Sequence, residues 1–240
     1  MKTALKILLM LGIIGYIAFA IIKFSEQPEE AVCEAVDIEF SDEDETPLVD
    51  AGYVSALLTK HKFSPEGQLL KATDLSAVEE ALEQNAYINK AKCYYKANNH
   101  LCIRVTTLRP ILHVITANED YYIDTTGVAM PVGDFNLDLC IATGNINKKT
   151  VKRDLIPLAW FIHQDAYWSR QVEQLDMNAK GEVCIIPREG THRILLGKPE
   201  GFETKLANMR LFNEQGFPKV GWNKYKAIDL RYSGQVIGIK

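Results

Sequence analysis

The order of hydrophobic periods over residues 36–108 limits the fold more than any other feature of this sequence. Residues 36–40 alternate between apolar and acidic, which is the period of a half-buried strand. Asp50 and Asp74 each precede a segment whose apolar residues lie three and four apart, as an N-cap precedes an amphipathic helix. The order is strand, helix, helix, strand, strand, predicted at 36–40, 51–60, 75–84, 87–96 and 101–107. It predicts a compact α+β unit with both helices on one face of the sheet.

From residue 109 onward the pattern changes to short strand candidates separated by Gly, Asn and Asp. Two helices are expected among them, one near 150–164, where Pro157 implies a kink or a late start. The other is expected at 199–215, with Pro199 at its first position. Residues 109–240 are therefore predicted to form a second domain, a mostly antiparallel β sheet with a few helices.

The last 16 residues, 225–240, predict a β-hairpin with a two-residue turn at Ser233-Gly234. Its closing strand, 235–240, is mostly apolar, and an open strand edge invites another chain to pair with it. Tyr232 adds an amphipathic anchor of the kind enriched at binding hot spots. We predict a partner-binding site that works by β-augmentation and consists of Arg231, Tyr232, Ser233, Gln235, Val236, Ile237, Gly238 and Ile239.

The alternative for this strand is that Val236, Ile237 and Ile239 only fill the domain core. Both interpretations can hold, because one face of a strand can pack inward while its edge pairs with a partner.

The N-terminus contains a charge-free apolar run between Lys6 and Lys23. Together with the lysine stems, its length predicts a transmembrane helix at 7–24. A cleaved signal peptide ending at Ala18-Phe19-Ala20 is the alternative, but the apolar run continues past that point. The predicted anchor residues are Ile7, Leu8, Leu9, Leu11, Ile13, Ile14, Ile17, Phe19, Ile21 and Ile22.

Flanking charge predicts the orientation of this anchor. Lys2 and Lys6 favour a cytoplasmic tail at 1–6, whereas the segment after the anchor is acidic. The sequence thus predicts a single-pass protein of the cytoplasmic membrane. Its juxtamembrane segment and first domain, 25–108, and its second domain, 109–240, would lie outside the cytoplasm.

No sequence motif indicates an enzyme. The chain lacks a phosphate loop, G-x-G-x-x-G, H-E-x-x-H and G-x-S-x-G, and a net charge of −4 gives no basic footprint for nucleic acid. The acidic run 41–47 lacks the ligand spacing of a calcium loop. We therefore expect no catalytic residue, metal, cofactor or small-molecule substrate.

The five cysteines are widely spaced and odd in number, which predicts neither a disulfide framework nor a zinc site. With Asn98-Asn99 as the turn of the first hairpin, Cys93 would face Arg104 and Cys102 would face Tyr95. The two sulfurs would then be diagonal neighbours, outside disulfide geometry, and we expect them to stay reduced.

Four stretches in order resemble the FtsQ/DivIB family of bacterial cell-division proteins. They are "NAYINKAKCYYKANNHLCIRVTTLRPIL", "YYIDTTGVAMP", "LGKPEGFETKLANM" and "AIDLRYSGQVIGIK". The matching positions include Arg109-Pro110, Tyr122, Asp124 and the Ile228–Tyr232 segment. Ala86 and Leu108 depart from the family pattern, where Pro and Glu are frequent.

The resemblance implies a POTRA domain up to Leu108, a β domain from Arg109, and a non-enzymatic scaffold of the divisome at the division septum. It also implies partners, namely FtsB/DivIC-like and FtsL-like coiled-coil proteins and other divisome components. The alternative function is a POTRA-type chaperone or secretion component that handles nascent strands.

Overall fold

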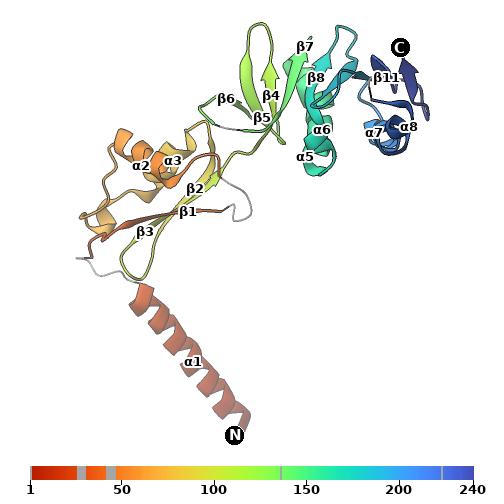
Figure 1. Cartoon of the computed structure of the whole chain (residues 1–240). Coiled ribbons are helices and arrows are strands. Elements are labelled where there is room, and N and C mark those ends of the chain that lie inside the picture. Colours follow the sequence, from red (N-terminus) through yellow and green to blue (C-terminus); the bar gives the residue numbers. More distant parts are fainter. Residues whose placement is uncertain (1, 26–30, 42–46, 136, 223) are drawn as a thin grey trace. The chain divides into compact units, whose positions relative to one another are not determined.

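A computed structural model describes residues 2–25, 31–41, 47–135, 137–222 and 224–240. Within the first helix, side chains are described at Lys6 and at positions 9–20. The chain divides into two compact units, Met1–Thr107 and Leu108–Lys240 (Figure 1). The acidic positions 42–46 lie outside the described residues.

The N-terminal segment forms a helix, α1, over Lys2–Ser25. Its described side chains from Leu9 to Phe19 are exposed. Among the described residues, no helix is long and apolar enough to cross a membrane. This finding contradicts the prediction of a transmembrane helix at 7–24. Of the predicted anchor residues, Ile7, Leu8, Ile21 and Ile22 have side chains outside the described set.

The first unit contains the predicted strand–helix–helix–strand–strand order. Its sheet has the order β1-β3-β2, with β1 parallel and β2 antiparallel to β3, and α2 and α3 pack on one of its faces (Figure 1). Both predicted N-caps are present, because Asp50 accepts from the Tyr53 N–H at 2.7 Å and Asp74 from the Ala77 N–H at 3.1 Å. The elements are β1 Val36–Phe40, α2 Ala51–Lys60, a 3₁₀ turn Leu70–Ala72, α3 Leu75–Glu83, β2 Ile88–Tyr95 and β3 Leu101–Thr107.

The β2–β3 hairpin differs from the expected one by one residue. Cys93 pairs with Ile103, and Cys102 pairs with Tyr94. The cause is a three-residue loop: Lys96 N–H donates to His100 O at 2.9 Å, and Asn99 has a φ of 59°. Because this shift places Cys93 and Cys102 on opposite faces of the sheet, the expected diagonal contact is wrong, and both cysteines are free thiols.

The second unit is a nine-stranded mixed sheet with the order β12-β11-β10-β9-β8-β7-β4-β5-β6. The pairs β4–β7, β7–β8 and β10–β11 are parallel, and the other neighbours are antiparallel. The strands are β4 Pro110–Ile115, β5 Asp120–Asp124, β6 Ala129–Pro131, β7 Cys140–Gly144, β8 Val172–Met177, β9 Val183–Pro187, β10 Arg193–Gly197, β11 Ala227–Asp229 and β12 Ile237–Ile239.

Both predicted helices of this unit contain a π-helical segment. The first consists of α4 Lys148–Thr150, π segment η2 Val151–Leu155 and α5 Ile156–Gln164, and a short α6 follows at Trp168–Gln171. Pro157 stands at the start of α5, directly after the π segment, so the helical segment that begins at Lys148 does not start late. The second consists of α7 Phe202–Leu211, π segment η3 Phe212–Gly216 and α8 Phe217–Val220. Pro199 does not begin α7, because Gly201 is its N-cap, in the left-handed conformation.

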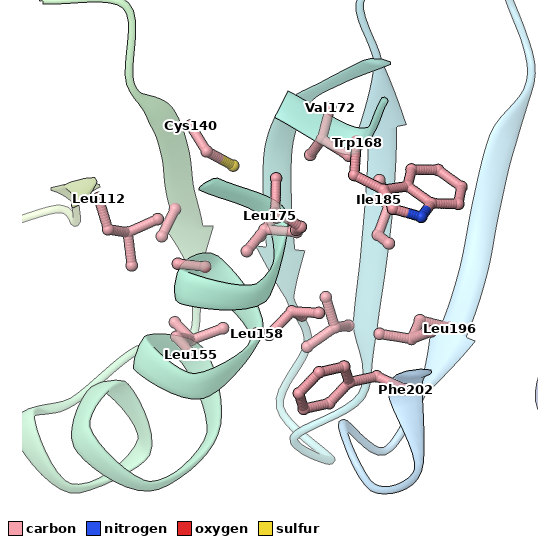
Figure 2. Close-up of a cluster of buried hydrophobic side chains, with 14 of the residues drawn as sticks. Leu112, Cys140, Leu155, Leu158, Trp168, Val172, Leu175, Ile185, Leu196 and Phe202 are labelled. Carbon is pink, nitrogen blue, oxygen red and sulfur yellow. The ribbon is translucent and has the colours of Figure 1, made fainter. Parts of the chain in front are cut away.

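The core of the second unit lies between the sheet and these helices. Figure 2 shows Leu155 and Leu158 from η2–α5 and Phe202 from α7 facing the strands. Their partners include Leu175, Ile185 and Leu196 from three neighbouring strands, each fully buried. This packing fixes the sheet up to β10 and β11, to which the final strand is attached.

Candidate functional site: the β12 edge

The C-terminal hairpin is less regular than the sequence predicts. β11 and β12 pair antiparallel, with Ala227 opposite Ile239 and Asp229 opposite Ile237. The turn at Ser233-Gly234 is present, because Gln235 N–H donates to Tyr232 O at 3.1 Å and Gly234 has a φ of +70°. However, the strands stop short of this turn, so β12 spans Ile237–Ile239 and not 235–240.

β12 is the terminal strand of the nine-stranded sheet. Ile237 and Ile239 are each 39% exposed, so neither fills the core. Val236 packs partly against the core cluster, and Gly238 faces the ring of Tyr225, where a Cβ would lie 2.5 Å from the ring carbon Cε1. Val236 and Gly238 thus pack against the rest of the domain, while the isoleucines and the outer edge of the strand face solvent.

Two other sheet edges carry protection that β12 lacks within the described part of the chain. In β2, the N–H groups of Ala91 and Cys93 donate to the side chains of Glu83 and Glu79, at 3.1 and 2.7 Å. β6 ends at Pro131, which has no N–H to offer. An edge that keeps its apolar side chains and has neither device is the kind that another strand can extend.

Asp229 and Arg231 fix the backbone just before the turn. Asp229 is buried, and it accepts from Arg231 Nε at 2.9 Å, from Nη2 at 2.7 Å and from the Arg231 backbone N–H at 3.0 Å. The Arg231 guanidinium lowers the pKa of the Asp229 carboxyl. Gly197, which has a φ of +75°, lies against the Arg231 side chain: a Cβ at this position would be 2.8 Å from Arg231 Cγ.

The segment from Leu230 to Gln235 forms one wall of a cavity of about 280 Å³, and the first turns of α7 form the other. Lys205 lines this cavity, and its Nζ donates to Leu196 O at 3.0 Å and to Lys198 O at 2.8 Å. Burial lowers the pKa of its ammonium group. Tyr232, which is 57% exposed, stands at the rim. A partner residue placed beside Tyr232 would therefore meet a hollow surface.

The predicted site residues are neighbours, but they have different roles. Tyr232, Ser233, Gln235, Ile237, Gly238 and Ile239 are exposed, whereas Val236 is partly buried and Arg231 is bound to Asp229 within the chain. Sequence reasoning assigned no role to Asp229, Tyr225 or Gly197. The spacing of Asp229 and Arg231 was a usable signal, since residues two apart on a strand share a face.

The described residues offer no second kind of site at this edge. No group of three or more His, Cys, Asp or Glu side chains that could hold a metal ion occurs among them. What the β12 edge presents is main-chain hydrogen-bonding groups, two isoleucines and a tyrosine, which suits binding of a polypeptide.

Comparison with known protein families gives two matches. A family model described as "FtsQ/DivIB, C-terminal related" matches residues 109–238, and one described as "POTRA-like domain" matches residues 31–106. No curated protein matches the chain.

Proposed function

This chain belongs to the FtsQ/DivIB family of non-catalytic cell-division proteins, and on that premise we propose that it holds a partner strand along β12. Family membership implies a scaffold role at the division site. The observation that supports the finer proposal is the exposed outer edge of β12, with Ile237 and Ile239 each 39% exposed.

The proposed mechanism is β-augmentation. A partner strand would add to β12 through main-chain hydrogen bonds, and alternate side chains would contact Ile237 and Ile239. Tyr232 would contribute a large apolar contact with a hydroxyl at its end, at the rim of the cavity beside α7. The Asp229–Arg231 pair would hold the turn in place before binding, so that little conformational entropy is lost when the partner binds.

The proposed partners are FtsB/DivIC-like and FtsL-like coiled-coil division proteins, through which the chain would connect to other divisome components. An extended segment of such a partner would supply the added strand.

The test measures binding of these partners to the purified full chain. Tyr232→Ala removes a hot-spot side chain, so we expect a loss of about 2 kcal/mol, or about thirtyfold in affinity. Val236→Pro and Ile237→Pro each remove one backbone donor, and since neighbouring donors alternate in direction, one variant should weaken binding more than the other. Trp160→Ala is the matched control, because it removes another exposed aromatic side chain, on α5.

Thermal unfolding of each variant separates binding from folding. If Tyr232→Ala and both proline variants keep wild-type affinity, or if every loss of affinity follows a loss of fold, the proposal fails. A POTRA-type chaperone would instead bind many unrelated extended strands with similar affinity, which titration with unrelated extended peptides would reveal.

A further inference from the structure

A cavity of about 680 Å³ lies over β5 and β6, near the end of the sheet opposite to β12. We call it the β5–β6 trough. Its floor is formed by Tyr121, Ile123, Ala129 and Pro131, and its walls carry Glu119 and Asp120 as well as Lys148 and Lys152. The proposed function does not use this surface.

Strand pairing explains the floor. Tyr121 lies opposite Pro131 and Ile123 lies opposite Ala129, so all four side chains are on one face of the sheet. Val151, the first residue of η2, closes the inner side and is fully buried. The trough is therefore an apolar floor bordered by the helical layer.

The charges of the trough are separated along β5. Glu119 and Asp120 lie at its start. The stem of Lys152 passes near Gly127, just after its end, where a Cβ would be 3.8 Å from Lys152 Cδ. At about 3.3 Å per residue, Asp120 and Ile123 are roughly 10 Å apart. The trough thus has an acidic end and a basic end with apolar surface between them.

The basic end is available to a ligand. In the described part of the chain, neither Lys148 nor Lys152 forms an ion pair. At the acidic end, Asp120 lies 2.6 Å from His113 Nε2, while no ion pair engages Glu119 among the described residues. A simple anion bound to the lysines would leave the acidic end unmatched. Strand addition at β6 is disfavoured because that edge ends in Pro131.

We propose that the β5–β6 trough binds an extended segment of a partner protein with an acidic and a basic residue on either side of apolar residues. About four residues span 10 to 13 Å in extended form. The acidic residue would lie at Lys148 and Lys152, the basic one at Glu119, and the apolar side chains between them on Tyr121 and Ile123. This second site is distinct from β12 and would let one chain hold two partners.

The probe is the peptide Ac-Asp-Val-Thr-Val-Lys-NH2, titrated into the full chain with ¹³C-methyl isoleucine. Ile123 lies on the floor of the trough, so its methyl signals report occupancy. We expect saturable shifts with this peptide and at least tenfold weaker binding when Asp and Lys are replaced by Asn and Gln. Reversing the order of the two charges is not a control, because an extended peptide can bind in either direction.

Reversing the charge of the two trough lysines is the decisive test of the proposal. Lys148→Glu combined with Lys152→Glu should weaken the Asp/Lys peptide at least tenfold and strengthen a Lys/Lys peptide by a similar factor. Lys149→Glu is the matched control, since this neighbouring lysine is exposed and does not line the trough. Equal binding of the neutral peptide, equal binding of an Asp/Asp peptide, no Ile123 shift, or the same effect from Lys149→Glu would each overturn the proposal.

Discussion

Arg231 binds Asp229 through two parallel hydrogen bonds, Nε to Oδ1 at 2.9 Å and Nη2 to Oδ2 at 2.7 Å, at the point where β11 gives way to the C-terminal turn. The acceptor is buried and the donor is partly exposed, with side chains 5% and 43% accessible. Such a fork fixes direction as well as distance. It therefore orients the turn that carries Tyr232.

The Asp229–Arg231 pair predicts a pH-dependent stability. The folded-state pKa of Asp229 lies below its usual 3.8, so its stabilising effect is present above that value and is lost as pH falls through the folded-state pKa. Asp229→Asn should lower the melting temperature at pH 7, and the difference from wild type should shrink between pH 4 and pH 2. Glu203→Gln, an exposed change on α7, serves as control. A difference that persists unchanged at pH 2 would contradict the assignment.

Gly197 predicts a steric effect that can be isolated. Gly197 and Gly234 have similar φ values, +75° and +70°, but only Gly197 would bring a Cβ against Arg231. Each alanine variant should lose about 1–2 kcal/mol from the left-handed backbone alone. Gly197→Ala should lose more, measured by urea unfolding, because Arg231 Cγ must also move. Equal losses would show that Arg231 gives way freely.

The cysteines predict low thiol reactivity. Burial is the main cause that raises the pKa of Cys93 to about 12 and that of Cys140 to about 12. Both thiols should react with iodoacetamide at pH 8 far more slowly in the folded chain than in urea, because the thiolate is the reactive form. Peptide mass spectrometry resolves each site. Rapid labelling of Cys93 in the native protein, or a Cys93–Cys102 cross-linked peptide, would show that the hairpin register is wrong.

Glu79 predicts a role in protecting the β2 edge. Its carboxylate accepts from the Cys93 N–H at 2.7 Å and binds Lys92 Nζ at 3.0 Å, and the Cys93 N–H is the leading cause of its lowered pKa. Glu79→Ala should expose this edge and increase concentration-dependent self-association, measured by analytical ultracentrifugation. Glu80→Ala, the neighbouring residue without a bond to β2 among the described contacts, should leave the monomer unchanged. Identical behaviour of the two variants would count against edge protection by Glu79.

Local chemistry in the sequence was enough to locate the helices of the first unit and the first strand. Asp50 and Asp74 cap their helices by accepting a hydrogen bond from the backbone N–H three residues later, an interaction contained within four residues. The apolar stripe of Phe202, Leu206 and Met209 is likewise buried, since its spacing depends only on helical geometry. The exposed C-terminal edge was also predictable in outline, from apolar residues around a Ser-Gly turn.

Tertiary structure decided what depends on distant residues. Asn99 in the left-handed conformation lengthens the first hairpin loop and shifts the β2–β3 pairs from Lys90 to Tyr95 by one. The parallel pairs β4–β7, β7–β8 and β10–β11 cannot be read from alternation, which is the same in either direction. β12 is short because Leu230 is buried and bonds to Leu195 O, while Asp229 and Gly197 fix Arg231. The Leu230–Leu195 and Gly197–Arg231 contacts cross more than 30 positions of sequence, so only the folded chain brings these residues together.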